Sequence, residues 1–231
     1  MSIDRRQALK LLGGALVLGA CAKDGNDDGG GAAATSASSS STTSTTAFDG
    51  AASCTVAPEQ TAGPFYLDVD AIRSDIREDR EGTPLKVSVR VLDADGCTPL
   101  KDAVFEIWHC DADGDYSGFG DAPKASRFLR GAQVTDAAGV ATILTIYPGW
   151  YEGRAVHIHA MVHLNNAEVL TTQLYFDDAV SNEVFAAAPY SRRGKADVSN
   201  SRDRIFRPET MLTTVKEGDG YVGRITIGVR A

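Results

Sequence analysis

Long apolar runs, sustained helical periodicity and internal repeats are all absent from this sequence of 231 residues. Without an apolar run of about 20 residues, the chain has no candidate for a membrane-spanning helix. Without apolar residues that recur every three or four positions, it has no candidate for a helical bundle. The lack of a repeating unit argues against a solenoid. These absences leave mainly β structures to consider.

Positive charge is also in short supply. The 23 Lys and Arg residues are outnumbered by 31 Asp and Glu residues, which gives a formal net charge of −8. Residues 1–20 hold three of the basic residues and one of the acidic ones, so the rest of the chain has a net charge of −10. This acidic balance argues against binding to nucleic acid and against docking on a membrane surface by charge.

The first 20 residues have the pattern of an export signal. Arg5-Arg6 precedes a short apolar stretch at residues 11–18, and this arrangement resembles a twin-arginine signal. The stretch ends in "LGAC", which resembles a bacterial lipobox. The resemblance implies cleavage before Cys21 and a lipid on its sulfur. The alternative is an ordinary secretory signal followed by an incidental cysteine.

We therefore expect an exported lipoprotein that is anchored to a membrane only through Cys21 and that faces the periplasm or the cell exterior. Residues 29–47 contain only Gly, Ala, Ser and Thr, a composition that is typical of a disordered linker. We divide the chain into a signal peptide (1–20), a lipidated cysteine with its linker (21–53) and one folded domain (54–231).

Cysteine is scarce as well, because after Cys21 the chain has only Cys54, Cys97 and Cys110. Outside the cytoplasm, two of these are expected to form a disulfide. Cys97 and Cys110 lie on either side of a predicted strand, which holds its two ends apart. We favour the pair Cys54–Cys97, and Cys54–Cys110 is the next candidate. Both stay open, because the sequence does not determine the connectivity.

Short strands separated by turn signals dominate the chain after residue 54. In "LKVSVRV", apolar residues from Leu85 to Val91 alternate with polar ones, which is the pattern of a half-buried strand. Residues 68–80 and 179–190 are left for short helices or loops. Six such strands predict an all-β fold of mainly antiparallel strands, a sandwich or a barrel. The predicted segments are 84–96, 102–111, 140–149, 155–164, 169–178 and 220–231.

Only four histidines are present, and three of them lie in "YPGWYEGRAVHIHAMVH" at residues 147–163. In a strand, His157 and His159 project from the same face and are close enough to bind one metal ion. Such pairs occur in zinc and copper sites, so a Zn or Cu site with His163 as third ligand is one hypothesis. The position of His163 near an Asn-Asn turn favours a solvent-facing side chain instead.

Two tyrosines accompany the histidine pair. Tyr151 shortly precedes His157, and Tyr116 follows a turn in "WHCDADGDYSGF". A phenol has a pKa near 10 and binds a metal only when the charge of the cation stabilises the phenolate. The phenolate is a hard anionic oxygen, which suits Fe(III). Two phenolates and two neutral imidazoles would lower the charge of Fe(III) from +3 to +1. The remaining positive charge would attract an anionic substrate.

Four segments in a fixed order make the pattern specific. They are "EQTAGPFY" (59–66), "WHCDADGDYSGF", "YPGWYEGRAVHIH" and "TTQLYF". Together they resemble the intradiol ring-cleavage dioxygenases, the family of catechol 1,2- and protocatechuate 3,4-dioxygenases. The resemblance extends from about residue 54 to residue 178, and it implies a β-sandwich core.

By this resemblance, the metal is a non-haem Fe(III), and its ligands are Tyr116, Tyr151, His157 and His159. Arg154 matches an arginine that lies against the substrate, and Gln173 matches an active-site glutamine. Tyr151 is expected to leave the iron and to take a proton from the substrate. The implied reaction uses O2 to cleave a catechol-type ring between its two hydroxyl-bearing carbons and gives a cis,cis-muconate-type diacid. Residues 54–231 would thus form a catalytic domain.

The sequence departs from this family in one respect. Nothing in it resembles the helical amino-terminal region through which cytoplasmic catechol dioxygenases form dimers, so the oligomeric state and the range of catechols stay open. A non-catalytic surface lipoprotein that binds aromatics or polysaccharide on the same scaffold is a further hypothesis. Such a protein would be expected to have lost at least one residue of the implied site, and this sequence retains the full set.

Overall fold

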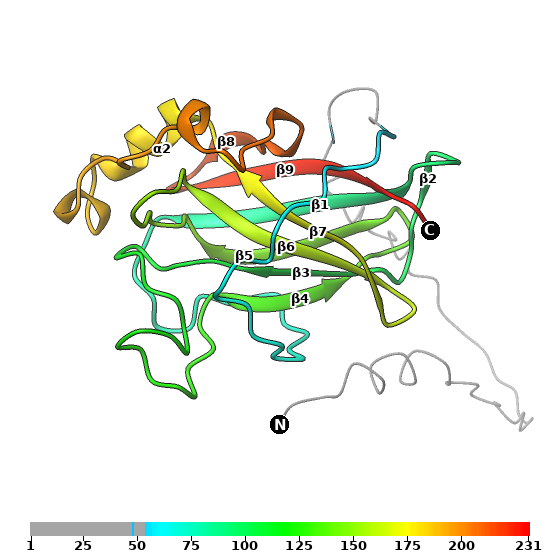
Figure 1. The fold of residues 1–231 in the computed structure, drawn as a ribbon, viewed down its shortest axis with the longest axis horizontal. Coiled ribbons are helices and arrows are strands. Elements are labelled where there is room, and N and C mark those ends of the chain that lie inside the picture. Colours follow the sequence, from blue (N-terminus) through cyan, green and yellow to red (C-terminus); the bar gives the residue numbers. More distant parts are fainter. Residues whose placement is uncertain (1–47, 49–53) are drawn as a thin grey trace, which may run out of the picture.

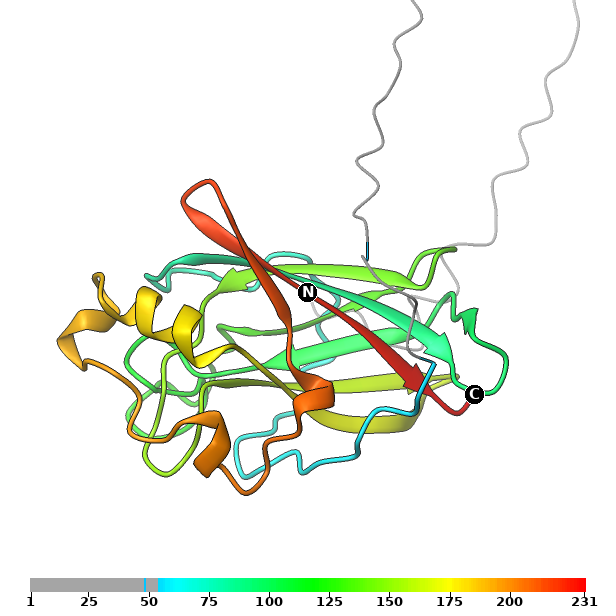
Figure 2. The same ribbon diagram turned by 90° about the horizontal axis from the view of Figure 1, so that it is seen from above.

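The structure of the protein, a computed structural model, describes residue 48 and residues 54–231. The expected signal peptide, Cys21 and nearly all of the linker lie outside the described residues. Two β-sheets form the two layers of the domain and helical segments are few, so the predicted all-β sandwich is confirmed (Figures 1 and 2). In the part of the chain that the structure describes, no helix has the length and apolar character needed to cross a membrane.

The five-stranded sheet is built around β1 (Pro84–Asp93). One edge of β1 pairs in parallel with β9 (Gly220–Val229), which in turn pairs with the antiparallel edge strand β8 (Thr213–Glu217). The other edge of β1 pairs with two strands along its length. β5 (Val140–Ile146) pairs with the first part of β1, and β2 (Thr98–Pro99) pairs with its last residues. The strand predicted at residues 84–96 is therefore a central strand of the sheet.

The four-stranded sheet has the order β4, β3, β6, β7, and all of its pairs are antiparallel. Its register places Trp108 next to His159, and His159 next to Gln173, on three neighbouring strands. Residues that are far apart in the sequence therefore meet at one end of this sheet. The bounds are β3 (Val104–Trp108), β4 (Arg130–Val134), β6 (His157–Leu164) and β7 (Ala167–Tyr175).

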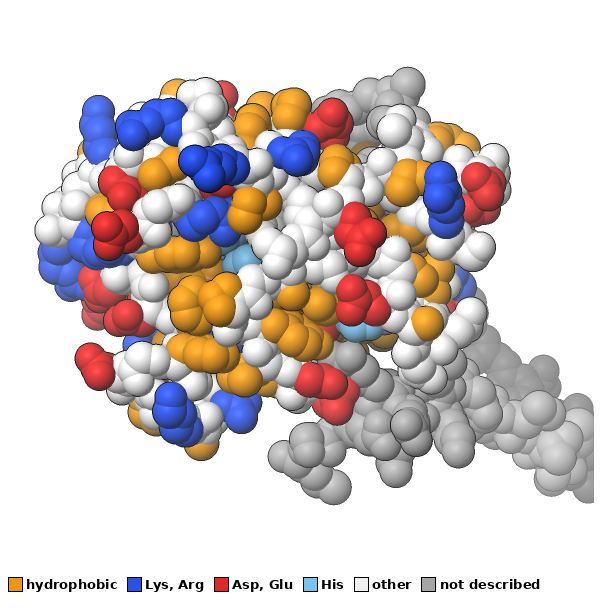
Figure 3. All heavy atoms as spheres, viewed as in Figure 1, with side chains coloured by type: hydrophobic (Ala, Val, Ile, Leu, Met, Phe, Trp, Pro, Cys, Tyr) orange, Lys and Arg blue, Asp and Glu red, His pale blue; other side chains and the backbone are white. Residues whose placement is uncertain are grey.

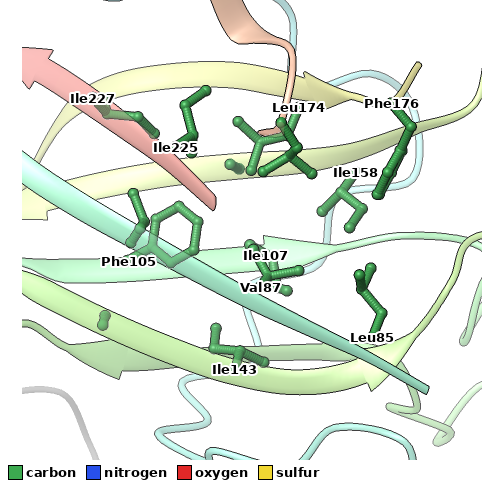
Figure 4. Packing of buried hydrophobic residues seen from close by; sticks show 14 of the residues in the cluster. Leu85, Val87, Phe105, Ile107, Ile143, Ile158, Leu174, Phe176, Ile225 and Ile227 are labelled. Carbon is green, nitrogen blue, oxygen red and sulfur yellow. The ribbon is translucent and has the colours of Figure 1, made fainter. Parts of the chain in front are cut away.

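The hydrophobic core lies between the two sheets (Figure 4). Leu85 and Ile143 enter it from the five-stranded sheet and Ile158 enters it from the four-stranded sheet, each with no exposed surface. Full burial of such a side chain contributes about 1.5–3 kcal/mol. Because Ile158 points into the core, its neighbours His157 and His159 point to the outer face of the four-stranded sheet.

In residues 54–231, helical segments occur only after β7, and they lie along the upper edge of the domain in Figure 1. α2 (Asp178–Phe185) begins after Asp177, whose side chain accepts a hydrogen bond from the backbone nitrogen of Ala179. Three short 3-10 helices follow, and residues 68–80 form loop structure with isolated β-bridges. The 3-10 helices are η1 (Tyr190–Arg192), η2 (Asn200–Arg202) and η3 (Pro208–Thr210).

A disulfide joins Cys54 to Cys97, with 5.3 Å between their Cα atoms, while Cys110 is buried and free. This is the pairing favoured from the sequence. The segment after Cys54 also forms a β-bridge to β9, from Val56 to Gly228. The two cysteines are 43 residues apart, and a loop of this size gives a stabilisation of about 4 kcal/mol on the chain-entropy view. The bond therefore ties the start of the domain to the turn after β1.

Candidate active site

β6 presents His157 and His159 on the outer face of the four-stranded sheet. Their Nε2 atoms lie 3.2 Å apart, and the two residues are 2% and 0% exposed. Nδ1 of His157 bonds to the backbone oxygen of Ala155 at 2.7 Å, and this bond assigns the proton to Nδ1 and leaves Nε2 as an acceptor. The ring of His159 stacks on Trp108, with 5.1 Å between centroids. Packing and hydrogen bonding therefore hold the two Nε2 atoms toward each other.

The segment "GPFY" at residues 63–66 lies against His159. Gly63 has a φ of +67°, and a Cβ at this position would lie 3.1 Å from Cε1 of His159. A larger residue would therefore be strained here and would press on the imidazole. Phe65 stacks on Tyr116 at 4.4 Å between centroids and meets Tyr151 edge-on at 5.9 Å.

Tyr151 reaches the histidine pair from the turn that follows β5. Its hydroxyl oxygen lies 3.1 Å from Nε2 of His157. Gly149 makes this turn possible, because a Cβ there would lie 2.4 Å from the backbone oxygen of Asp111. The side chain of Tyr151 is only partly buried, in contrast to the two histidines.

Tyr116 completes the group from the loop after β3. Its ring lies 5.8 Å from that of Tyr151 and 6.2 Å from that of His159, measured between centroids. It is 3% exposed, and its hydroxyl has no hydrogen-bond partner within the described residues. A buried hydroxyl without a partner costs about 1–3 kcal/mol. Its position therefore fits a ligand atom that bonds to something outside the protein.

Burial sets the protonation of these four groups. Burial, together with the charge of Arg154, lowers the pKa of His157 to about 3, and burial also lowers the pKa of His159. The same burial raises the pKa of Tyr116 and of Tyr151. The imidazoles are therefore neutral with lone pairs to offer, and the phenols lose a proton only beside a strong cation. Two imidazoles and two phenols without a thiolate fit a hard, highly charged ion such as Fe(III).

Arg154 lies beside this group and is held on three sides. Its Nε donates to Oδ2 of Asp203 at 2.9 Å, and its Nη2 donates to Oε1 of Gln173 at 2.5 Å and to the hydroxyl of Tyr175 at 3.0 Å. Its Nη1 lies 3.4 Å from the hydroxyl oxygen of Tyr151. The positive charge of Arg154 is therefore held next to the hydroxyl of Tyr151.

Gln173 is fully buried, and both ends of its amide are used by the protein. Besides Arg154, its Oε1 accepts from the hydroxyl of Tyr175 at 2.9 Å, and its Nε2 donates to the backbone oxygen of Thr61 at 2.8 Å. The structure thus places Gln173 beside Arg154, with its side chain in support of the guanidinium.

His163 does not join the group. The prediction of a solvent-facing side chain is wrong, because His163 is 8% exposed and its Nε2 lies 3.1 Å from Oε2 of the buried Glu106. A polar ring can be buried at this position because a carboxylate pairs with it. In residues 54–231 no three side chains among His, Cys, Asp and Glu are grouped so as to hold a metal. The Zn or Cu hypothesis therefore lacks its third ligand.

Two further residues of the site were not singled out from the sequence. Tyr175 follows Gln173 by two positions and projects from the same face, so strand periodicity could have found it. Asp203 lies 49 residues after Arg154 in a segment of short turns and 3-10 helices, where no sequence pattern marks it. Its place in the site follows only from the folded structure.

The surroundings of the site are visible from outside. In Figure 3, histidine atoms show between hydrophobic side chains on the face seen in Figure 1, and Lys and Arg side chains gather above them. The segment 190–207, which contributes Asp203, also contains six Lys and Arg residues. This segment is therefore basic, although the chain as a whole is acidic.

Comparison with known proteins identifies the family. A model of the dioxygenase family matches residues 58–210. Catechol 1,2-dioxygenase from Acinetobacter baylyi is 32% identical over 141 residues, which cover 51% of this chain and 45% of that protein. The alpha chain of protocatechuate 3,4-dioxygenase from Pseudomonas putida is 26% identical over 182 residues, which cover 71% of this chain and 85% of that one. The chain spans about half the length of the catechol and chlorocatechol dioxygenases that it matches.

Solved structures show the same relationship. An intradiol ring-cleavage dioxygenase from Tetranychus urticae superposes with a TM-score of 0.73 at 33% identity, and the match covers 76% of this chain and 95% of that one. The dioxygenase domain of a carbohydrate-binding fusion protein from Streptomyces sp. SirexAA-E superposes with a TM-score of 0.59 at 29% identity, over 75% of this chain and 97% of that one. The chain therefore belongs to the family of intradiol ring-cleavage dioxygenases.

Proposed function

We propose that the protein is a non-haem Fe(III) dioxygenase that cleaves a catechol-type ring between its two hydroxyl-bearing carbons. Both atoms of O2 enter the product, a cis,cis-muconate-type diacid, so the reaction needs no separate reductant. The observation that carries the proposal is one group of side chains, in which two neutral imidazoles and two phenols converge from three parts of the chain. These residues are Tyr116, Tyr151, His157 and His159.

These four residues would hold the iron, which supplies Lewis acidity and activates the bound catechol toward O2. Tyr151 is better placed than Tyr116 to take a proton from the substrate, because it is only partly buried whereas Tyr116 is 3% exposed. With iron bound, Tyr151 would be a phenolate, and the proton of the substrate would go to its oxygen, which Nη1 of Arg154 faces. Arg154 would then stabilise the negative charge that develops on the ring.

The proposed substrate class is catechol and its substituted forms. Relatives at 32% and 31% identity are named catechol 1,2-dioxygenase and chlorocatechol 1,2-dioxygenase, and these names support an aromatic diol. Two segments would decide which substituents of the ring fit. One directly follows Tyr116 (residues 117–130), and the other includes Asp203 (residues 179–206). A panel of catechols with different substituents would define the preference.

A non-catalytic binding role has less support. It would leave unexplained why the buried hydroxyl of Tyr116 lacks a partner and why Arg154 is held with one nitrogen toward Tyr151. The first feature opposes folding, because a buried polar group without a partner costs free energy. Both are expected if the group receives a metal ion and an anionic substrate.

The metal content and colour of the purified protein test the proposal. The iron-loaded protein is expected to contain about one iron per chain, to be red to burgundy through phenolate-to-Fe(III) charge transfer, and to consume O2 when a catechol is added. Chelation should abolish both the colour and the O2 uptake. Adding Fe(III) should restore both, and adding Zn²⁺ should restore neither.

Two histidine variants give the matched control. His159→Ala should lose the iron, whereas His163→Ala should keep it, because His163 pairs with Glu106 away from the group. The measurements are metal analysis, visible spectroscopy and oxygen uptake with the catechol panel. A colourless zinc protein would contradict the proposal, and so would a coloured iron protein that cleaves none of the catechols.

We also propose that the protein is exported and anchored by a lipid on Cys21. The sequence pattern before Cys21 supports this, and so does the disulfide between Cys54 and Cys97, because such bonds are typical of oxidising compartments. Ring cleavage would then take place outside the cytoplasm.

Cys21→Ser is expected to move the protein from the membrane fraction to the soluble fraction, because serine cannot accept the lipid through sulfur. Cell fractionation followed by immunoblotting measures the distribution. Cys110→Ala is the matched control, since Cys110 is a buried free cysteine of the folded domain and its loss should leave the protein in the membrane fraction. A membrane-bound Cys21→Ser variant would contradict the anchor.

A further inference from the structure

The guanidinium of Arg154 is held in one orientation. A guanidinium carries five N–H donors in a planar fork. The Nε donor goes to Asp203, and Nη2 donates to Gln173 and to Tyr175. Among the described residues, Nη1 makes only a long contact of 3.4 Å, to the hydroxyl of Tyr151. The fork is thus fixed at Nε and Nη2, and Nη1 is left to face the site.

Asp203 provides the charged part of this arrangement. Its Oδ2 accepts from Nε of Arg154 and from the backbone nitrogen of Ala155 at 3.0 Å, and its Oδ1 accepts from the backbone nitrogen of Ile205 at 2.8 Å. The side chain is only 2% exposed. Burial alone would raise the pKa of Asp203, but the backbone hydrogen bonds and the charge of Arg154 outweigh burial and lower it. The carboxylate is therefore charged at neutral pH.

The segment that carries Asp203 is fastened at other points as well. Nδ2 of Asn200 donates to the backbone oxygen of Phe176 at 2.6 Å, and the backbone nitrogen of Asn200 donates to the carboxylate of Asp178 at 3.2 Å. Nε2 of Gln60 donates to the backbone oxygen of Ile205 at 2.5 Å. Because of these contacts, a change at Asp203 can release Arg154 without releasing the whole segment.

We propose that Asp203 is a positioning residue, which directs Nη1 of Arg154 at the place where the ring of the substrate becomes negative. This inference rests on the proposed function. Gln173 and Tyr175 are neutral and hold one end of the fork, whereas a charged acceptor makes a hydrogen bond about twice as strong as a neutral one. Without the charge of Asp203 the fork can turn, and a displacement of about 1 Å is enough to slow a reaction about 100-fold.

A double-mutant cycle tests the proposal. Asp203→Asn removes the charge and keeps the shape, and its effect is measured both in the wild-type protein and in the Arg154→Ala variant. In the wild type, kcat is expected to fall by about 10- to 100-fold, with iron content and the catechol-induced shift of the visible band unchanged. In the Arg154→Ala background, the further loss should be less than about twofold, because the group that Asp203 positions is gone.

Asp178→Asn is the matched control, because Asp178 holds the same segment through Asn200 but does not contact Arg154. This variant should keep kcat within about twofold of the wild type. Equal losses from Asp203→Asn in both backgrounds would overturn the inference, since Asp203 would then act through the fold alone. Wild-type kcat in Asp203→Asn would also overturn it.

Failure of the proposed function would be visible separately, as an iron-loaded wild type that cleaves no catechol. In that case a crystal structure of Asp203→Asn decides the inference without reference to turnover. A guanidinium that turns away from Tyr151 would support the positioning role. A guanidinium that stays in place, still bonded to Gln173 and Tyr175, would overturn it.

Discussion

Tyr151→Phe is expected to keep its iron and to lose turnover by about 100-fold or more. The variant retains the ring that meets Phe65 and Tyr116, but it lacks the phenol oxygen that lies 3.1 Å from Nε2 of His157. Three ligands remain to hold the metal, but the group in place to take the proton of the substrate is gone. The measurements are iron per chain and kcat from oxygen uptake at saturating catechol.

Tyr147→Phe is the matched control for this experiment. It also removes a buried hydroxyl, which bonds to Oγ of Ser181 at 2.8 Å in the core and away from the histidine pair. Its loss should lower the free energy of unfolding by about 1 kcal/mol and leave kcat unchanged. Wild-type turnover in Tyr151→Phe would remove Tyr151 from the reaction. Loss of the iron would show that Tyr151 serves mainly to hold the metal.

Arg154→Ala is expected to bind a catechol and to cleave it about 100 to 1,000 times more slowly than the wild type. Binding should persist because the four metal ligands are unchanged, and it would appear as a shift of the visible band when catechol is added. Cleavage should slow because Nη1 is no longer present to stabilise negative charge on the ring. Stopped-flow spectroscopy separates the two steps, since the band shift precedes the loss of substrate.

Arg154→Ala also leaves the buried carboxylate of Asp203 without its cation, which is expected to destabilise the fold. Arg154→Lys separates stability from reactivity, because lysine keeps the charge but has no planar fork. It should recover much of the stability and little of the turnover. Arg192→Ala, at an exposed arginine that pairs with Asp113, should change neither property. Normal cleavage by Arg154→Ala would exclude Arg154 from the reaction.

Much of the fold could be predicted because its central strands alternate clearly between apolar and polar residues. β4 and β8 were missed for different reasons. In β4, the sequence "RGAQV" contains a glycine and the buried Arg130, whose Nε bonds to the hydroxyl of Ser117, and these residues hide the period. β8, with the sequence "TTVKE", is a mostly exposed edge strand set by backbone pairing with β9. Local patterns do not encode pairing of that kind.

The site could be predicted to a similar extent. Strand periodicity alone places His157 and His159 together, whereas Tyr116 and Tyr151 needed the family resemblance, because a tyrosine after a turn more often serves in packing. The structure brings all four together and adds the contacts of Arg154 and Gln173. Asp203 could not be predicted, since its position depends on a turn segment that is placed only when the sandwich is complete.

The two sheets become available at different times while the chain is being synthesised. The strands of the four-stranded sheet all lie between Val104 and Tyr175, so they can pair soon after they leave the ribosome. β1 begins at Pro84, but its parallel partner β9 begins only at Gly220. Until β9 emerges, β1 presents an open edge, which invites pairing with other chains. A message truncated before residue 220 would therefore yield a chain that carries every proposed iron ligand yet depends on chaperones to stay out of aggregates.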